Sequence, residues 1–94
     1  MLNIEQLLFF FVSHLSIVLL FASVYWIVDT FVLDKKGLKS DKKELNWFDC
    51  LYFSLVTQTT VGYGDIVPNH TITKIINMFQ LLSVYGLITY NLFV

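Results

Sequence analysis

Two long runs without a charged residue flank a more polar middle segment. The first run covers residues 7–28, and the second covers residues 75–94. A helix rises about 1.5 Å per residue, so each run is long enough to cross the roughly 30 Å hydrocarbon layer of a bilayer. The pattern predicts an outer and an inner transmembrane helix. A signal sequence would need a basic segment before the first run, but residues 1–6 contain no Lys or Arg.

The start of the first helix carries its own signal. Asn3 is followed three residues later by Gln6, the spacing of a capping box, in which each side chain accepts a hydrogen bond from the other residue's backbone. We therefore expect the first helix to begin close to the N-terminus.

The segment between the runs divides into two parts. Residues 29–45 form a predicted turret, in which 34–44 are polar, include a glycine and have no apolar face. Residues 46–59 have helical spacing instead, with Asn46 as a capping residue type and Asp49 in the first turn. The residues expected to follow this spacing are Trp47, Cys50, Leu51, Ser54, Leu55 and Gln58.

This expected helix is about 20 Å long, which is too short to cross a bilayer. It must therefore be re-entrant. Non-helical backbone at membrane depth is tolerated only where it is buried in protein or lines water. The pattern implies an aqueous pathway beside the loop that follows residue 59.

Composition narrows the class of protein further. Of the 94 residues, 56% are hydrophobic and only 14% are charged, against about 25% charged in a soluble domain. This excludes a disordered chain, and a formal net charge of -1 gives no support to nucleic-acid binding. The single cysteine, Cys50, cannot form a disulfide within one chain. We expect a membrane protein with the lipid bilayer as partner, no soluble substrate and no enzymatic activity.

Residues 59–65 have the sequence TTVGYGD. This motif resembles the selectivity filter of potassium channels, whose signature is TVGYG. The order of outer helix, turret, pore helix, filter and inner helix is similar to that of the miniature two-helix potassium channels of large algal viruses, and the resemblance covers nearly the whole chain. It implies an all-α membrane protein whose re-entrant pore helix and filter loop assemble into a homotetrameric pore.

The resemblance also implies a function and a set of ligands. The channel would conduct K⁺ passively, and the backbone carbonyls of Thr60, Val61, Gly62 and Tyr63 would bind the ion, with the Thr60 hydroxyl adding a ligand at the inner end. Carbonyls that all face one axis require backbone of alternating handedness, which glycine adopts at little cost. Glycines at 62 and 64 meet that requirement.

Three residues are expected to support the filter: Gly64, Asp65 and Tyr52. Tyr52 matches the position of a pore-helix tryptophan that bonds the acid after the filter in many relatives, and its hydroxyl could bond Asp65 in the same way. The alternative for Asp65 is a solvated acid at the outer mouth. The ring of Tyr63 is expected to brace the filter against the pore helix.

Polar residues within the runs leave more than one interpretation. His14 is either a functional ionisable group or, as we expect, a neutral imidazole bonded to the second helix. Helical geometry groups three polar residues of the second helix within about 60°, facing a wet cavity or a neighbouring helix: Asn77, Gln80 and Asn91. The resemblance instead directs a different set toward the cavity, and we favour it: Tyr85, Thr89 and Leu92.

Orientation and class also have alternatives. All six lysines lie between the two apolar runs or at the edge of the second. By the positive-inside rule this would favour a cytoplasmic loop, whereas the resemblance implies cytoplasmic termini and an extracellular pore loop, which we adopt. The rival class is a small structural or regulatory membrane subunit that assembles with another channel. A second rival is a pore of lower selectivity.

Overall fold

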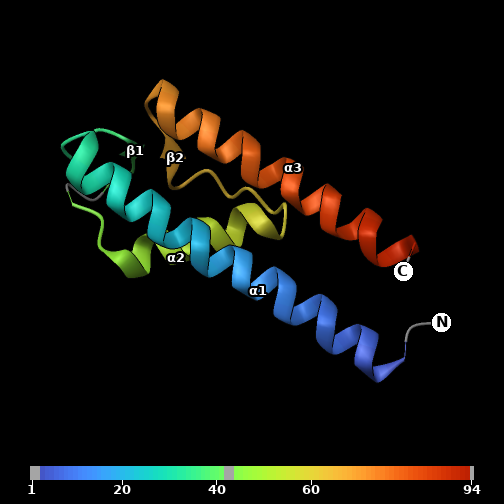
Figure 1. Ribbon diagram of the computed structural model, residues 1–94. Helices are drawn as coiled ribbons and strands as arrows, with labels where there is room; N and C mark the ends of the chain where they lie inside the picture. Colours follow the sequence, from blue (N-terminus) through green and yellow to red (C-terminus); the bar gives the residue numbers. More distant parts are fainter. Residues whose placement is uncertain (1–2, 42–43, 94) are drawn as a thin grey trace.

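The computed structural model describes residues 3–41 and 44–93. Its elements are α1 (Ile4–Ile27), the π-helical turn η1 (Val28–Val32), β1 (Leu38–Lys39), α2 (Trp47–Gln58), β2 (Val67–Pro68) and α3 (Thr71–Phe93). The molecule is elongated, with extents of 45 × 22 × 21 Å. The long helices α1 and α3 run in opposite directions, the start of α1 and the end of α3 lie at one end of the molecule, and the two short strands lie at the other (Figure 1).

The N-terminus of α1 is fixed by side-chain hydrogen bonds. Asn3 Oδ1 accepts from the Gln6 N–H at 2.8 Å, and Gln6 Oε1 accepts from the Asn3 N–H at 3.0 Å. This confirms the predicted capping box. The helix therefore begins at Ile4, three residues before the charge-free run, and η1 continues helical backbone into the residues that were predicted as turret.

The turret packs against the helices, so the expectation that residues 34–44 form a polar segment without an apolar face is wrong at Leu38. Gly37 and Leu38 are buried, and β1 pairs with β2 in an antiparallel register that sets Leu38 opposite Pro68. Asp29, only 2% exposed, accepts hydrogen bonds at Oδ1 from the N–H groups of Gly37 (2.9 Å) and Leu38 (3.0 Å). The Thr73 hydroxyl of α3 donates to the Gly37 carbonyl at 2.6 Å. The turret thus joins the ends of α1 and α3.

α2 begins with a second capping box. Asn46 Oδ1 accepts from the Asp49 N–H at 2.9 Å, and an Asp49 carboxylate oxygen accepts from the Asn46 N–H at 3.0 Å. The sequence predicts the cap at Asn46 and the acid in the first turn, and the structure adds the bond from the Asn46 N–H to Asp49. Two of the residues that follow the predicted spacing, Trp47 and Leu55, are exposed. The helix packs on α1 and on α3 at once, so its buried side covers a wider and rotated arc.

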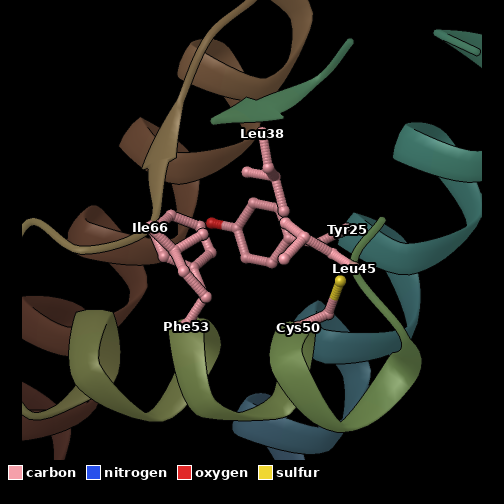
Figure 2. Close-up of a cluster of buried hydrophobic side chains, with 6 residues drawn as sticks. All are labelled: Tyr25, Leu38, Leu45, Cys50, Phe53 and Ile66. Carbon is pink, nitrogen blue, oxygen red and sulfur yellow. The ribbon is translucent and has the colours of Figure 1, made fainter. Parts of the chain in front are cut away.

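A hydrophobic core fixes α2 at the strand end of the molecule. Figure 2 shows the Tyr25 ring of α1 in the middle of this core. The centroids of the Tyr25 and Phe53 rings lie 4.9 Å apart in an edge-on contact. The buried members of this core are Tyr25, Leu38, Leu45, Cys50, Phe53 and Ile66. Because the core draws on α1, the turret, α2 and the segment after the loop, it fixes the position of the loop between α2 and β2.

Much of the remaining helix surface is apolar and exposed. Within the described part of the chain, two helices are long and apolar enough to cross a membrane, Ile4–Val32 and Thr71–Phe93. Their outward side chains include large aliphatic and aromatic residues along the full length of both helices. A surface of this kind needs lipid or other protein around it.

Candidate functional site

The loop of residues 59–65 follows α2 and returns toward β2 between α2 and α3 (Figure 1). Backbone bonds tie its start to the end of α2. The Thr60 N–H donates to the Thr57 carbonyl at 3.0 Å, and the Val61 N–H donates to the Val56 carbonyl at 3.1 Å. Every side chain from 59 to 65 is nevertheless exposed in the single chain. Hydrogen bonds to α2 hold the start of the loop, and the rest of its surface is exposed.

The backbone of this loop alternates in handedness. Three residues have positive φ: Thr60 at 61°, Gly62 at 62° and Gly64 at 84°. These residues alternate with Val61 and Tyr63, and the alternation allows successive carbonyls to face one side. A Cβ on Gly62 or Gly64 would meet nothing within 4 Å, so glycine is required there by conformation and not by space.

Thr60 is the unusual member of this alternation. A residue with a Cβ in the left-handed region costs about 1–2 kcal/mol relative to the right-handed one. Such a conformation persists where the surroundings hold it, and here the Thr60 N–H is bonded to α2. The strained threonine stands at the inner end of the loop, where the sequence predicts a hydroxyl ligand.

Tyr52 of α2 and Asp65 at the end of the loop lie close together. The hydrogen bond between them raises the pKa of the Tyr52 hydroxyl, and partial burial and the Asp65 charge act in the same direction. Both residues line a depression of about 370 Å³ that also includes Asp49 and Phe48. The bond links the middle of α2 to the outer end of the loop.

The predicted packing of Tyr63 does not occur within one chain. Its side chain is 71% exposed, so the ring is not braced against its own α2. Any bracing of this ring must come from another molecule.

His14 has a different partner from the one expected. Its Nδ1 lies 2.9 Å from Gln58 Nε2, so the imidazole bonds the last residue of α2 and not the second transmembrane helix. The sequence could not distinguish the two, because α2 and α3 both lie against α1.

Of the three polar residues of α3 that helical geometry groups together, Asn77 and Gln80 form hydrogen bonds to neighbouring helices. Gln80 is fully buried; its Oε1 accepts from the Tyr25 hydroxyl at 2.7 Å, and its Nε2 donates to the Ser54 carbonyl at 3.0 Å. Asn77 Nδ2 donates to the Tyr25 oxygen at 3.1 Å. Asn91 differs, since its Nδ2 donates to a carbonyl of its own helix, that of Leu87, at 2.8 Å. Tyr85, Thr89 and Leu92 are exposed.

Comparison with known proteins identifies the family. A family model described as an ion channel matches residues 7–94. The potassium channel protein kcv of Paramecium bursaria Chlorella virus 1 is 30% identical over 78 residues, which cover 83% of this chain and 83% of that protein. No solved structure gives a significant match.

Two further relatives are longer proteins. The hyperpolarization-activated voltage-gated potassium channel of Methanocaldococcus jannaschii is 36% identical over 86 residues, which are 90% of this chain and 37% of that protein. Two pore potassium channel a of Oryza sativa subsp. japonica is 54% identical over 37 residues, or 39% of this chain and 11% of that protein. The two apolar helices and the family match together indicate a membrane protein. The chain therefore belongs to the ion channel family, as a potassium channel domain of the small viral type.

Proposed function

We propose that this protein is a K⁺-selective channel that conducts the ion passively through a homotetrameric pore. In this proposal the ligands of the permeant ion are the backbone carbonyls of Thr60, Val61, Gly62 and Tyr63 and the Thr60 hydroxyl. K⁺ is the cargo of the channel, and the work of the chain is to replace its hydration shell with carbonyl oxygens. No covalent chemistry is involved.

One observation carries the proposal. Left-handed backbone recurs at every second position of the loop, at Thr60, Gly62 and Gly64. A plain turn between two helices needs one such residue, and it gains nothing from repetition. A strand that must present a row of carbonyls to one axis needs the repetition, which supports a filter over a turn.

The proposed tetramer follows from the exposure of the loop. A single strand cannot surround an ion, and closed symmetric oligomers are the usual solution. Fourfold symmetry would bring four exposed loops to one axis and would let a neighbouring subunit cover the Tyr63 ring. The C-terminal end of each α2 would then face the central cavity, where its partial negative charge favours a cation.

The proposed tetramer also gives roles to the other residues that the sequence singled out. Tyr52 and Asp65 would stabilise the outer end of the filter from behind, with Gly64 completing its backbone. The exposed positions Tyr85, Thr89 and Leu92 would line the inner cavity. The two chain ends would lie in the cytoplasm and the pore loop outside.

The proposal is tested by current through the purified protein alone in a planar bilayer. Ba²⁺ is close to K⁺ in size with twice the charge, so a site of carbonyl dipoles should hold it longer. We expect K⁺ current and voltage-dependent block by external Ba²⁺. A protein that passes no current without a partner channel is instead a regulatory subunit.

A further inference from the structure

A chain of hydrogen bonds crosses the apolar interior from α3 to α1 through the end of α2. Its direction is set by the Ser54 carbonyl, which can only accept. Gln80 Nε2 donates to that carbonyl at 3.0 Å, so the orientation of the Gln80 carboxamide is fixed. The same Nε2 lies 3.0 Å from Ser54 Oγ and 3.2 Å from Gln58 Oε1. Because two amide nitrogens that faced each other would repel, the side of the Gln58 carboxamide toward Gln80 is its oxygen. The NH₂ group of Gln58 therefore faces His14.

The orientation of Gln58 assigns the proton on His14. An amide NH₂ group can only donate, so the Nδ1 of His14, 2.9 Å away, must accept. An imidazole that accepts at Nδ1 is neutral and carries its proton on Nε2. That Nε2 is buried and has no hydrogen-bond partner among residues 3–41 and 44–93. A buried donor without a partner opposes folding, so the bond at Nδ1 must offset it.

Gln58 lies where such a bond matters. It is the last residue of α2, it is buried, and it stands two positions before Thr60. His14 reaches it from α1, and Gln80 reaches it from α3. The carboxamide is thus held from both long helices at the inner end of the loop.

We propose that Gln58 is a positioning residue for the inner end of the filter, and that it is held in place by His14 in the neutral form protonated at Nε2. The inference rests on the proposed channel function for its effect on current, but the assignment of the proton does not. The groove of about 470 Å³ beside His14 is lined by uncharged side chains only: apolar residues of α1, α2 and α3, with Gln58, Thr59 and Thr60. No charge in this lining competes with Gln58 for the imidazole.

The proton assignment is measured by ¹⁵N nuclear magnetic resonance on the full chain in lipid bilayers at neutral pH. His70, in the loop before α3, is the other histidine of the chain, and a His70→Asn variant identifies its signals. We expect His14 to give the pattern of a neutral ring with the proton on Nε2. A proton on Nδ1, or a doubly protonated ring, would overturn the proposal whether or not the protein conducts.

The positioning role is measured with two variants at position 14. His14→Asn keeps an acceptor at the place of Nδ1, whereas His14→Leu has no acceptor there. Loss of one ordinary hydrogen bond predicts openings about fivefold shorter in His14→Leu, with His14→Asn within about twofold of wild type. Gln58→Leu should match His14→Leu, and Ser16→Ala, whose hydroxyl bonds only its own helix at Val12, is the control.

Three outcomes decide the matter. Shorter openings that His14→Asn rescues support the positioning role. Equal effects of Asn and Leu at position 14 overturn it, because the acceptor would then be irrelevant. Heat resistance of the assembled protein is measured in parallel, so that a general loss of stability is not read as a loss of positioning. A wild-type protein without K⁺ current overturns the proposed function and the positioning role, and leaves the nuclear magnetic resonance result to decide the proton assignment.

Discussion

The Tyr25 hydroxyl on α1 donates a 2.7 Å hydrogen bond to Gln80 Oε1 on α3, and both side chains are fully buried. Asn77 donates to the same hydroxyl at 3.1 Å, so the phenol accepts one bond and donates another. Lipid tails give two apolar helices no hydrophobic reason to associate with each other. Polar contacts of this kind therefore contribute to holding α1 and α3 together.

Replacing Tyr25 with Phe removes the hydroxyl and keeps the ring. Gln80 loses a donor and Asn77 loses an acceptor in a buried site. We expect the assembled protein to lose about 1–2 kcal/mol of stability, measured by its heat resistance in detergent. Tyr90→Phe is the control, because Tyr90 is exposed. Equal effects of the two substitutions would show that the buried bond does not stabilise the protein.

The glycines of the loop provide a second prediction. Gly62→Ala and Gly64→Ala each place a Cβ where φ is positive, so we expect loss of K⁺-selective current from protein that still reaches the membrane. Gly86→Ala is the matched control. Gly86 lies within α3, and a Cβ there would meet nothing within 4 Å. Normal selective current from the two loop variants would refute the filter assignment.

The bond between Tyr52 and Asp65 predicts non-additive effects. Tyr52→Phe and Asp65→Asn should each shorten openings or lower the heat resistance of the assembly, while the reversal potential stays near that of K⁺. The double mutant should be no worse than the more severe single mutant, because each change breaks the same bond. Effects that add would mean that the two residues are not coupled and that Asp65 is a solvated acid.

The same bond has a consequence for pH. The hydrogen bond to Asp65 raises the pKa of Tyr52 in the folded state. The stabilisation that this hydrogen bond gives is therefore fully present at a pH below the pKa of tyrosine in the unfolded chain, about 10. It is lost as the pH rises through the higher pKa of Tyr52 in the folded state. Heat resistance of wild-type protein should fall over this alkaline range more than that of Tyr52→Phe. A parallel fall in both proteins would contradict this.

Close packing at Gly37 predicts a fourth effect, in the turret. A Cβ on Gly37 would lie 3.0 Å from Leu33 Cδ1 and 3.0 Å from Thr73 Cγ2, and 3.2 Å from Asp29 Oδ1. Gly37→Ala should therefore lower heat resistance by about 1–3 kcal/mol, the usual effect of overpacking. Lys36→Ala, at an exposed neighbouring position, should have little effect. Tolerance of the Gly37 variant would mean that the turret is free to move away from α3.

The sequence was sufficient for the elements that depend on local signals. Charge-free runs predicted the two long helices, the capping box at Asn3 predicted how α1 begins, and the capping residue Asn46 predicted the start of α2. The TTVGYGD motif identified the loop, and its matched position for Tyr52 predicted the contact with Asp65. These signals depend on residues close in sequence or on a motif of fixed spacing.

Contacts between distant segments could not be predicted in the same way. Leu38 is a single apolar residue in a polar segment, so no periodicity predicted its burial in the hydrophobic core around Tyr25. The partner of His14 depended on which helix lies nearer to α1 at that depth. The exposure of Tyr63 in the single chain depends on how the loop lies against α2, which no local pattern in the sequence specifies.

The reversal potential tests K⁺ selectivity most directly. The purified protein is placed in a planar bilayer with K⁺ on one side and an equal concentration of Na⁺ on the other, and K⁺ is then added stepwise to the Na⁺ side. A K⁺-selective filter predicts a reversal potential far from zero at first, which then follows the K⁺ gradient at about 59 mV per tenfold change. A reversal potential that stays near zero throughout would contradict the account, because such a pore does not distinguish the two ions.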